Sequence, residues 1–306
     1  MLGTEILGGD RIWLSWTGME TDLIFNHGVD LPNFAAFPLI DNPEGRARLR
    51  DYYEKLIQIG RDTGAGIILD TPTWMANPDR AISVGYAADD LPRVTREAVA
   101  LARGISEQHP DAAICVSVQI GPQGDGYEAG MQSAKLAASY HGPQIAAAKE
   151  AGADVVSAYT MGSAGEAIGI SLAAQEFGIP AIVSFVVETD GRLADGTTLA
   201  AAITQLTETA EPLAIMVNCA HPEHIAKGLD GGEWEAKLSG VVANASRQSH
   251  EELDNAEFLD DGDPDELSGQ LADMKCSHAG IRVLGGCCGT DLRHLRKIAE
   301  RVAAST

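Results

Sequence analysis

The sequence lacks any run of about 20 consecutive apolar residues, the length that a membrane-crossing helix requires. We therefore expect no membrane span. Basic residues are also scarce, since 22 Lys and Arg stand against 44 Asp and Glu, which gives a formal net charge of −22. Such a charge opposes binding to nucleic acid and to anionic membrane surfaces, so we expect neither as a partner.

Cysteine is scarce as well, with five residues in a chain of 306. A long chain with so few cysteines, and without a secretion signal in residues 1–9, is unlike a disulfide-rich secreted protein. We therefore expect a cytoplasmic protein. Cys115 lies inside an apolar run, where a small buried thiol is ordinary packing, and Cys276 lies on a polar helix end.

The remaining cysteines stand out, and two of them, Cys287 and Cys288, are adjacent at the end of the apolar run Ile281–Leu284. Neighbouring side chains of a regular strand point to opposite faces, so these thiols can serve one site only where the backbone has left the strand. Glycines permit that departure. A bond between adjacent cysteines would be strained, so a thiolate metal site is the better interpretation, and zinc is the usual metal. The flanking glycines are Gly285, Gly286 and Gly289.

Cys219 is the best candidate for a third ligand. It ends another apolar strand, Leu213–Asn218, and Pro222 opens the helix that follows. Three cysteine thiolates leave one position of a tetrahedral zinc open, as catalytic zinc sites require. His221 and His224 are weaker candidates, because three cysteines already suffice.

One pattern recurs eight times along the chain: a short β-branched run, polar or glycine-rich residues, then a helical stretch. This alternation predicts an α/β fold, a single (β/α)8 TIM barrel that forms one domain over residues 1–306. A doubly wound open sheet is the alternative, but it needs a glycine fingerprint after the first strand, which Thr17-Gly18-Met19-Glu20 does not supply. The predicted strands are Arg11–Trp16, Gly66–Asp70, Ala113–Ile120, Asp154–Tyr159, Ala181–Val187, Leu213–Asn218, Leu238–Asn244 and Ile281–Leu284.

The helical stretches have recognisable start signals. We expect a helix after Asn42-Pro43, and another over Leu292–Ala303 capped by Thr290-Asp291. A helical stretch over Met131–Ala151 should restart at Pro143. The connection 246–280 is longer than usual and holds an acidic stretch, 260–265, which we interpret as a solvated loop because it lacks the spacing of a calcium loop.

A barrel gathers the residues that follow its strands on one face, which brings Cys219 together with Cys287 and Cys288. The aromatic residues Trp16, Trp74 and Tyr159 also fall at predicted strand ends. Aromatic walls suit a cationic ligand, although these side chains could simply pack over the barrel mouth.

These residues resemble the homocysteine S-methyltransferase family. The resemblance covers essentially the whole chain and rests on Gly285–Thr290 with His294, on Val217–Cys219, on Gly121-Pro122 and on Ala151–Asp154. It implies a zinc-binding barrel that transfers a methyl group to the thiol of homocysteine and yields methionine. It also implies that Cys219, Cys287 and Cys288 are both the zinc ligands and the catalytic residues.

Two positions depart from the family pattern. The family usually has Asp-Gly-Gly at the end of the first strand, where this sequence has Trp16-Thr17-Gly18. The family also has a glutamate after the fourth strand that contacts the substrate amine, and we place Ala158 at that position. Three acids elsewhere in the chain could replace the lost charge: Glu20, Glu166 and Glu188.

The expected partners are a small-molecule thiol acceptor and a methyl donor, and a homo-oligomer is compatible with the sequence. The donor should be an activated cation of the sulfonium or betaine type. The predicted substrate-binding residues are Trp16, Thr17, Gly18, Trp74, Tyr159, Asn218, Asn244 and Gly286.

Three other functions fit parts of the pattern. The first is a family member with a changed acceptor, because Trp16 and Ala158 replace usual substrate-binding residues. The second is a hydrolase with a zinc-bound water, which the all-cysteine ligand set disfavours. The third is a non-catalytic zinc-binding barrel, in which a fourth ligand such as His221 would fill the open position.

Overall fold

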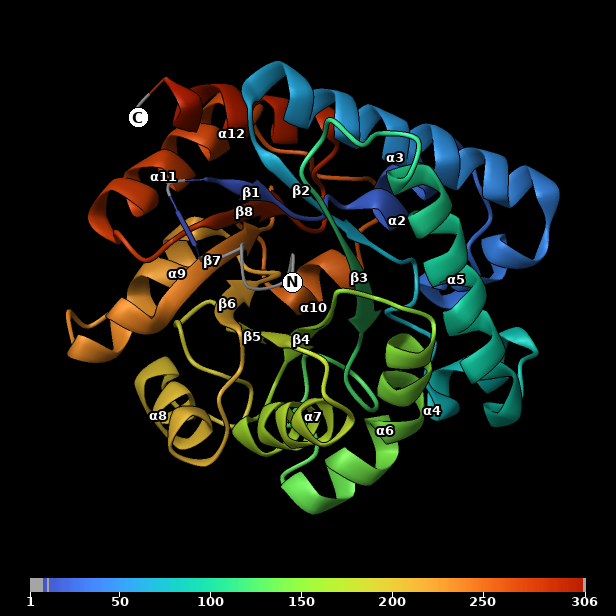
Figure 1. Ribbon diagram of the computed structural model, residues 1–306. Helices are drawn as coiled ribbons and strands as arrows, with labels where there is room; N and C mark the ends of the chain where they lie inside the picture. Colours follow the sequence, from blue (N-terminus) through green and yellow to red (C-terminus); the bar gives the residue numbers. More distant parts are fainter. Residues whose placement is uncertain (1–7, 10, 305–306) are drawn as a thin grey trace.

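The computed structural model describes residues 8–9 and 11–304, so most of the segment 1–9 lies outside the described residues. Eight parallel strands form a closed barrel in which each strand pairs with the next and β8 pairs with β1 (Figure 1). The predicted (β/α)8 barrel is confirmed. The strands are β1 (Trp13–Leu14), β2 (Gly66–Asp70), β3 (Ile114–Ile120), β4 (Val155–Met161), β5 (Ala181–Val186), β6 (Ala214–Asn218), β7 (Leu238–Ala243) and β8 (Val283–Gly286).

Helices surround the barrel and begin where the sequence supplies caps. The side chain of Asn42 accepts a hydrogen bond from Gly45 N at the start of α3, and Asp291 caps α12. The helices of the outer layer are α3 (Pro43–Thr63), α5 (Leu91–Ser106), α6 (Ala134–Glu150), α7 (Ala164–Phe177), α8 (Leu199–Thr209), α9 (Pro222–Gly228), α11 (Pro264–Ser277) and α12 (Leu292–Ala303). Shorter helices are α2 (Met19–Thr21), α4 (Pro78–Ala81) and α10 (His250–Asp254).

Several predicted boundaries were wrong. The first strand pairs only at Trp13 and Leu14, although Ser15 N still donates to Leu284 O beyond the ladder. Helix α6 continues through Pro143 without a restart. The connection 246–280 contains two helices, α10 and α11, and Asp263 within its acidic stretch caps α11.

The strands separate two apolar layers, because successive side chains point to opposite sides of a sheet. Leu69 and Ala158 pack outward in the layer under the helices, whereas Ile68 and Tyr159 belong to the smaller cluster inside the barrel. Tyr159 therefore points into the barrel while its neighbour Ala158 points away from it. None of the helices in the described part of the chain combines the length and apolar character needed to cross a membrane.

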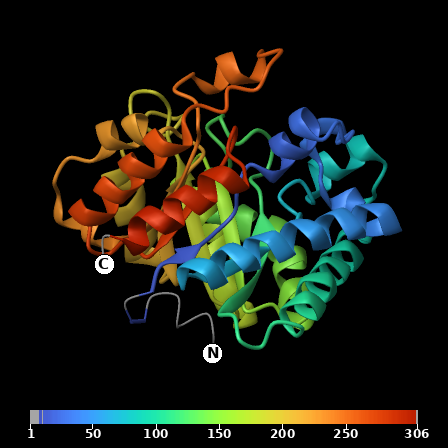
Figure 2. The same cartoon turned by 90° about the horizontal axis from the view of Figure 1, so that it is seen from above.

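Segments that follow the strands cover one end of the barrel. In the side view of Figure 2, the orange segment that contains α10 projects beyond this end. The dark blue region of α2 and the teal region of α4 lie at the same end. The strands have their carboxyl termini here, so this is the end at which a barrel of this kind gathers functional side chains.

Candidate functional site

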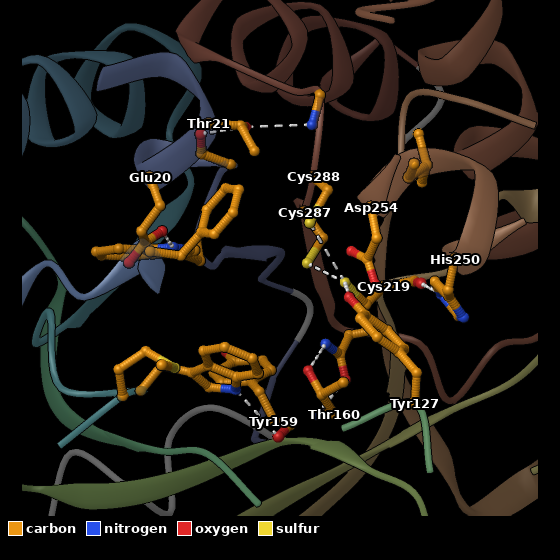
Figure 3. A pocket seen from close by; sticks show the side chains of 18 of the residues that line it. Glu20, Thr21, Tyr127, Tyr159, Thr160, Cys219, His250, Asp254, Cys287 and Cys288 are labelled. Atoms are coloured by element: carbon orange, nitrogen blue, oxygen red, sulfur yellow. Dashed lines mark hydrogen bonds between the residues drawn. The ribbon is translucent and has the colours of Figure 1, made fainter. Parts of the chain in front are cut away.

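Three thiols from two distant parts of the chain meet at the carboxyl end of the barrel. Cys219 follows β6, Cys287 and Cys288 follow β8, and β7 lies between these two strands. All three sulfur atoms lie within 4.8 Å of one another. The Sγ of Cys219 is 2.9 Å from that of Cys287 and 3.6 Å from that of Cys288 (Figure 3). The structure thus brings together all three cysteines that the sequence singles out.

The backbone of Cys219 adopts an unusual conformation to reach this position. Its φ of 56° lies in the left-handed region, which non-glycine residues rarely occupy. Two side chains hold its carbonyl: Asn244 Nδ2 donates to it at 3.0 Å, and His250 Nε2 lies 2.6 Å from it. Strain of this kind persists only where the surroundings fix it, and it is common at functional sites.

The paired cysteines sit on a tight turn rather than on a strand. Cys287 N donates to Ala243 O, and Thr290 N donates to Cys287 O across a turn in which Gly289 has a φ of 80°. Our prediction for the preceding glycines was wrong, because β8 runs through Gly285 and Gly286. Gly285 and Gly286 have no room for a side chain. A Cβ on Gly285, for example, would lie 2.9 Å from Trp16 O.

The thiol cluster fits a thiolate-bound metal ion. Tetrahedral zinc with Zn–S bonds of about 2.3 Å holds its sulfur atoms about 3.8 Å apart. The Cys219–Cys288 separation of 3.6 Å is close to this value, and Cys287 must move outward by less than about 1 Å. Within the described ranges, no further His, Cys, Asp or Glu joins the cluster. The nearby hydroxyl of Tyr127 lies 3.1 Å from Cys219 Sγ.

Without a metal, the three sulfurs share their protons unequally. The pKa of Cys219 lies well below its usual value, because the thiols of Cys287 and Cys288 donate hydrogen bonds to its sulfur. The pKa values of Cys287 and Cys288 are raised in turn, chiefly by their hydrogen bonds to Cys219. A divalent ion would take the place of these protons, so metal binding here releases them.

The thiols lie at a cavity of about 510 Å³. Six of the eight predicted substrate-binding residues line it: Trp16, Thr17, Gly18, Trp74, Tyr159 and Asn218. Asn244 and Gly286 do not. Asn244 is buried and bonded to the carbonyl of Cys219, while Gly286 lies within β8 against the side chain of Thr290. The side chain of Asn218 links β6 to β4. Its Oδ1 accepts a hydrogen bond from Thr160 N, and its Nδ2 donates to the hydroxyl of Thr160.

Loops supply cavity residues that the sequence analysis missed. Tyr127 comes from the β3–α6 connection and stacks on His250 of α10 with ring centroids 3.8 Å apart. Phe34 and Phe258 lie at the rim, 48% and 80% exposed. The sequence carries one usable signal, the capping box of Ser249 and Glu252 that starts α10.

A buried carboxyl lies beneath the cavity inside the barrel. Ser15 and Tyr159 donate hydrogen bonds to Asp70 Oδ2 at 3.2 and 3.1 Å, while Oδ1 has no partner. Burial raises the pKa of Asp70 to about 7, against the hydrogen bonds that favour its ionised form. Asp70 is fully buried and does not line the cavity.

Asp70 should make stability depend on pH. Because its folded pKa is raised from 3.8 to about 7, the folded state binds more protons than the unfolded chain between these values. The free energy of unfolding should therefore fall as the pH rises from about 4 to 7, and level off above 7. Asp70→Asn should remove this contribution, which changes the free energy of unfolding by on the order of 4 kcal/mol across this pH range. Urea denaturation of both proteins with chelator, at pH 4 to 8, measures the difference, and equal slopes would refute it.

A (β/α)8 barrel with a thiol cluster at the carboxyl ends of its strands defines the class of protein. The model of the homocysteine S-methyltransferase family matches residues 17–302, so the chain belongs to that family. It is an enzyme of the homocysteine S-methyltransferase kind.

Solved structures share the fold. The homocysteine methyltransferase MmuM from Escherichia coli, in its metallated form, superposes with a TM-score of 0.73 at 23% identity, covering 96% of this chain and 97% of that chain. Its oxidized form gives 0.72 at 22% identity, covering 95% and 96%. A methyltransferase from Methanosarcina mazei gives 0.52 at 14% identity, covering 99% and 97%. None of the curated protein sequences compared with the chain gives a match.

Proposed function

We propose that this protein is a zinc-dependent S-methyltransferase whose zinc is held by Cys219, Cys287 and Cys288. The methyl group would pass from a small sulfonium or betaine-type donor to the thiol of homocysteine or a related thiol, with methionine as the product from homocysteine. One observation carries the proposal: three thiols converge at an aromatic-walled cavity, and three protein ligands are the number that catalytic zinc sites use. The likeness to MmuM, a homocysteine methyltransferase with a metallated form, supports it.

Zinc bound by these thiolates would lower the pKa of the acceptor thiol and hold its sulfur in place. In the transfer, the electron pair of the acceptor sulfur would form the S–CH3 bond, while the donor's C–S or C–N bond would break and its electron pair would stay on the leaving atom. The acceptor proton passes to solvent. The donor leaves as a neutral thioether or amine, so the transfer needs no further reactant.

The protein's own residues position the reaction. Asn244 and His250 fix the carbonyl of Cys219, and Thr290 fixes the turn of Cys287. Holding ligands in this way keeps their geometry constant during turnover. The rings of Trp16 and Trp74 line the cavity, where they can stabilise a cationic donor and keep out water that would otherwise solvate it.

The structure offers little support for the competing functions. His221 caps α9 by accepting a hydrogen bond from Glu223 N, and it is not part of the thiol cluster. A structural zinc site with His221 as its fourth ligand is therefore disfavoured. A related thiol as the acceptor remains part of the proposal, because Trp16 and Tyr159 are bulky and line the cavity.

A crossed methyl-transfer assay tests the proposal. Several thiol acceptors, homocysteine among them, are combined with sulfonium and betaine-type donors, with and without a chelator. We expect at least one pair to yield a methylated thioether, which mass spectrometry detects. The chelator should prevent its formation. Absence of methionine from every homocysteine reaction would remove that acceptor, and absence of any product would overturn the proposed function.

A further inference from the structure

The cavity contains one carboxyl group in an unusual position. Glu20 of α2 lines the cavity and is partly buried, and Trp16 Nε1 donates a hydrogen bond to its Oε2 at 3.3 Å. Over the described ranges, no Lys, Arg or His forms an ion pair with it. Burying a carboxylate without a cation beside it costs free energy, so binding of a positively charged partner to such a group is favourable.

The two other acids that the sequence suggested are already occupied by histidines. Asp254 also lines the cavity, but it lies on the same side as Cys219 (Figure 3). Glu166 Oε1 lies 2.8 Å from His141 Nε2 in a fully buried pair, and it also accepts from Gln123 N. Glu188 lies 2.9 Å from His250 Nδ1. Neither residue lines the cavity. Of the three acids that the sequence suggested, only Glu20 lines the cavity.

The end of β4 offers no negative charge either. We placed the substituted position at Ala158, but this was wrong, because Ala158 packs outward under the helices. Tyr159 is the residue that faces the cavity, and its hydroxyl bonds Ser15 and Asp70. A cation in the cavity therefore finds no partner on β4.

Glu20 lies on the opposite side of the cavity from the thiols. In Figure 3 it stands across the open space from Cys287 and Cys288, with Tyr159 below. A substrate that placed its sulfur at the thiols and its cation at Glu20 would therefore lie across the cavity. Burial raises the pKa of Glu20 to about 7, and an arriving cation would restore its ionised form.

We propose that Glu20 binds the positively charged group of the substrate and thereby selects cationic substrates. The proposal rests on the proposed function, since it takes the thiols as the place of the substrate sulfur. The cation has two possible sources, the ammonium group of an amino-acid acceptor or the cationic centre of the donor. Trp16, bonded to Glu20, supplies an aromatic surface for either one.

Calorimetry on the zinc-loaded protein tests the acceptor source without turnover. The ligands are homocysteine and 4-mercaptobutanoate, which is homocysteine without its amine. The variant Glu20→Gln keeps an oxygen for the indole N–H and removes only the charge. Wild type should bind homocysteine at least tenfold more tightly than the analogue, and Glu20→Gln should reduce this preference to less than twofold. Glu20→Met repeats the test with a neutral side chain of similar length.

The donor source is tested by the KM of the donor, with 4-mercaptobutanoate as the acceptor. If Glu20 contacts the donor, Glu20→Gln should raise this KM at least tenfold. Glu257→Gln is the matched control, because Glu257 is exposed near the rim without lining the cavity. This variant removes one charge from the same region, and both its acceptor preference and its donor KM should stay within twofold of the wild-type values.

One result overturns the proposal: neither the acceptor preference nor the donor KM changes by more than twofold in Glu20→Gln and Glu20→Met. A failure of the proposed function would look different. In that case wild type yields no methylated thioether from any pair, whereas the calorimetric comparison still decides whether Glu20 binds a cation.

Discussion

Replacement of Cys288 by serine should abolish both zinc binding and methyl transfer. A serine hydroxyl does not ionise at neutral pH as a zinc-bound thiol does, and oxygen is a poorer ligand in a site built from thiolates. Loss of a residue that merely supports a ligand costs about 10–100-fold. Loss of the ligand itself should exceed that, so we expect activity to fall by more than about 100-fold. Elemental analysis of the purified protein and product formation at saturating zinc measure the two effects.

Cys276→Ser is the control for this experiment. Cys276 is exposed on α11 and lies outside the thiol cluster, so the same chemical change there should leave zinc content and rate unaltered. A Cys288→Ser protein that turns over without bound metal would contradict the proposed role of the cluster. A variant that keeps its zinc but loses its activity would place Cys288 at the reaction rather than among the ligands.

Gly286→Ala should destabilise the protein and weaken its hold on the metal. A Cβ at this position would overlap Thr290 Oγ1 and lie 2.6 Å from Thr290 Cβ. Thr290 cannot simply rotate away, because its hydroxyl donates to Cys287 O at 2.8 Å and accepts from Gly18 N at 3.1 Å. We expect a loss of about 3 kcal/mol in the free energy of unfolding. Because the turn of Cys287 moves with Thr290, zinc affinity measured by competition with a chelator should fall as well.

Gly104→Ala provides the comparison, since Gly104 lies within α5 and an added Cβ there meets nothing within 4 Å. Alanine is the better helix former, so this variant should gain about 0.5–1 kcal/mol. Urea denaturation of both variants in the presence of chelator isolates the packing effect from metal binding. If Gly286→Ala proved as stable as wild type, the close packing of Thr290 on β8 would not hold in solution.

The fold and the thiol cluster could be predicted because both follow from regular geometry. Alternating strands and helices define the barrel, and a barrel brings the residues that follow its strands to one end. Cys219 and Cys287 are 68 positions apart, yet their sulfurs lie 2.9 Å from each other. No knowledge of loops was needed to bring them together.

The details that depend on steric fit could not be predicted. Glycine after an apolar run usually indicates that the strand has ended, but Gly285 and Gly286 continue β8 because neighbouring atoms leave no room for a Cβ. The error at Ala158 was a shift of one residue, which in a strand exchanges the two faces. These choices depend on contacts between distant segments, which periodicity does not encode.

The loop residues of the site were also beyond prediction. Tyr127 and His250 stack against each other although they are far apart in sequence. Each lies in a connection between a strand and a helix, and the course of such a connection does not follow from periodicity. Glu20 illustrates the same limit. The sequence indicated it as one of three acids. The folded chain distinguishes it, because Glu20 lines the cavity, whereas Glu166 and Glu188 do not line it and lie against histidines.

The placement of the cysteines on β6 and β8 has a consequence for biogenesis. In a nascent chain that has not yet docked β8, Cys219 is separated from the pair Cys287 and Cys288, so the three thiolates do not converge for tight capture of the proposed ion. Metal loading would therefore follow ring closure, and a bound ion would oppose the dissociation of the last strand. Chelation should consequently accelerate spontaneous opening at the seam between β8 and β1, where hydrogen exchange would report it first.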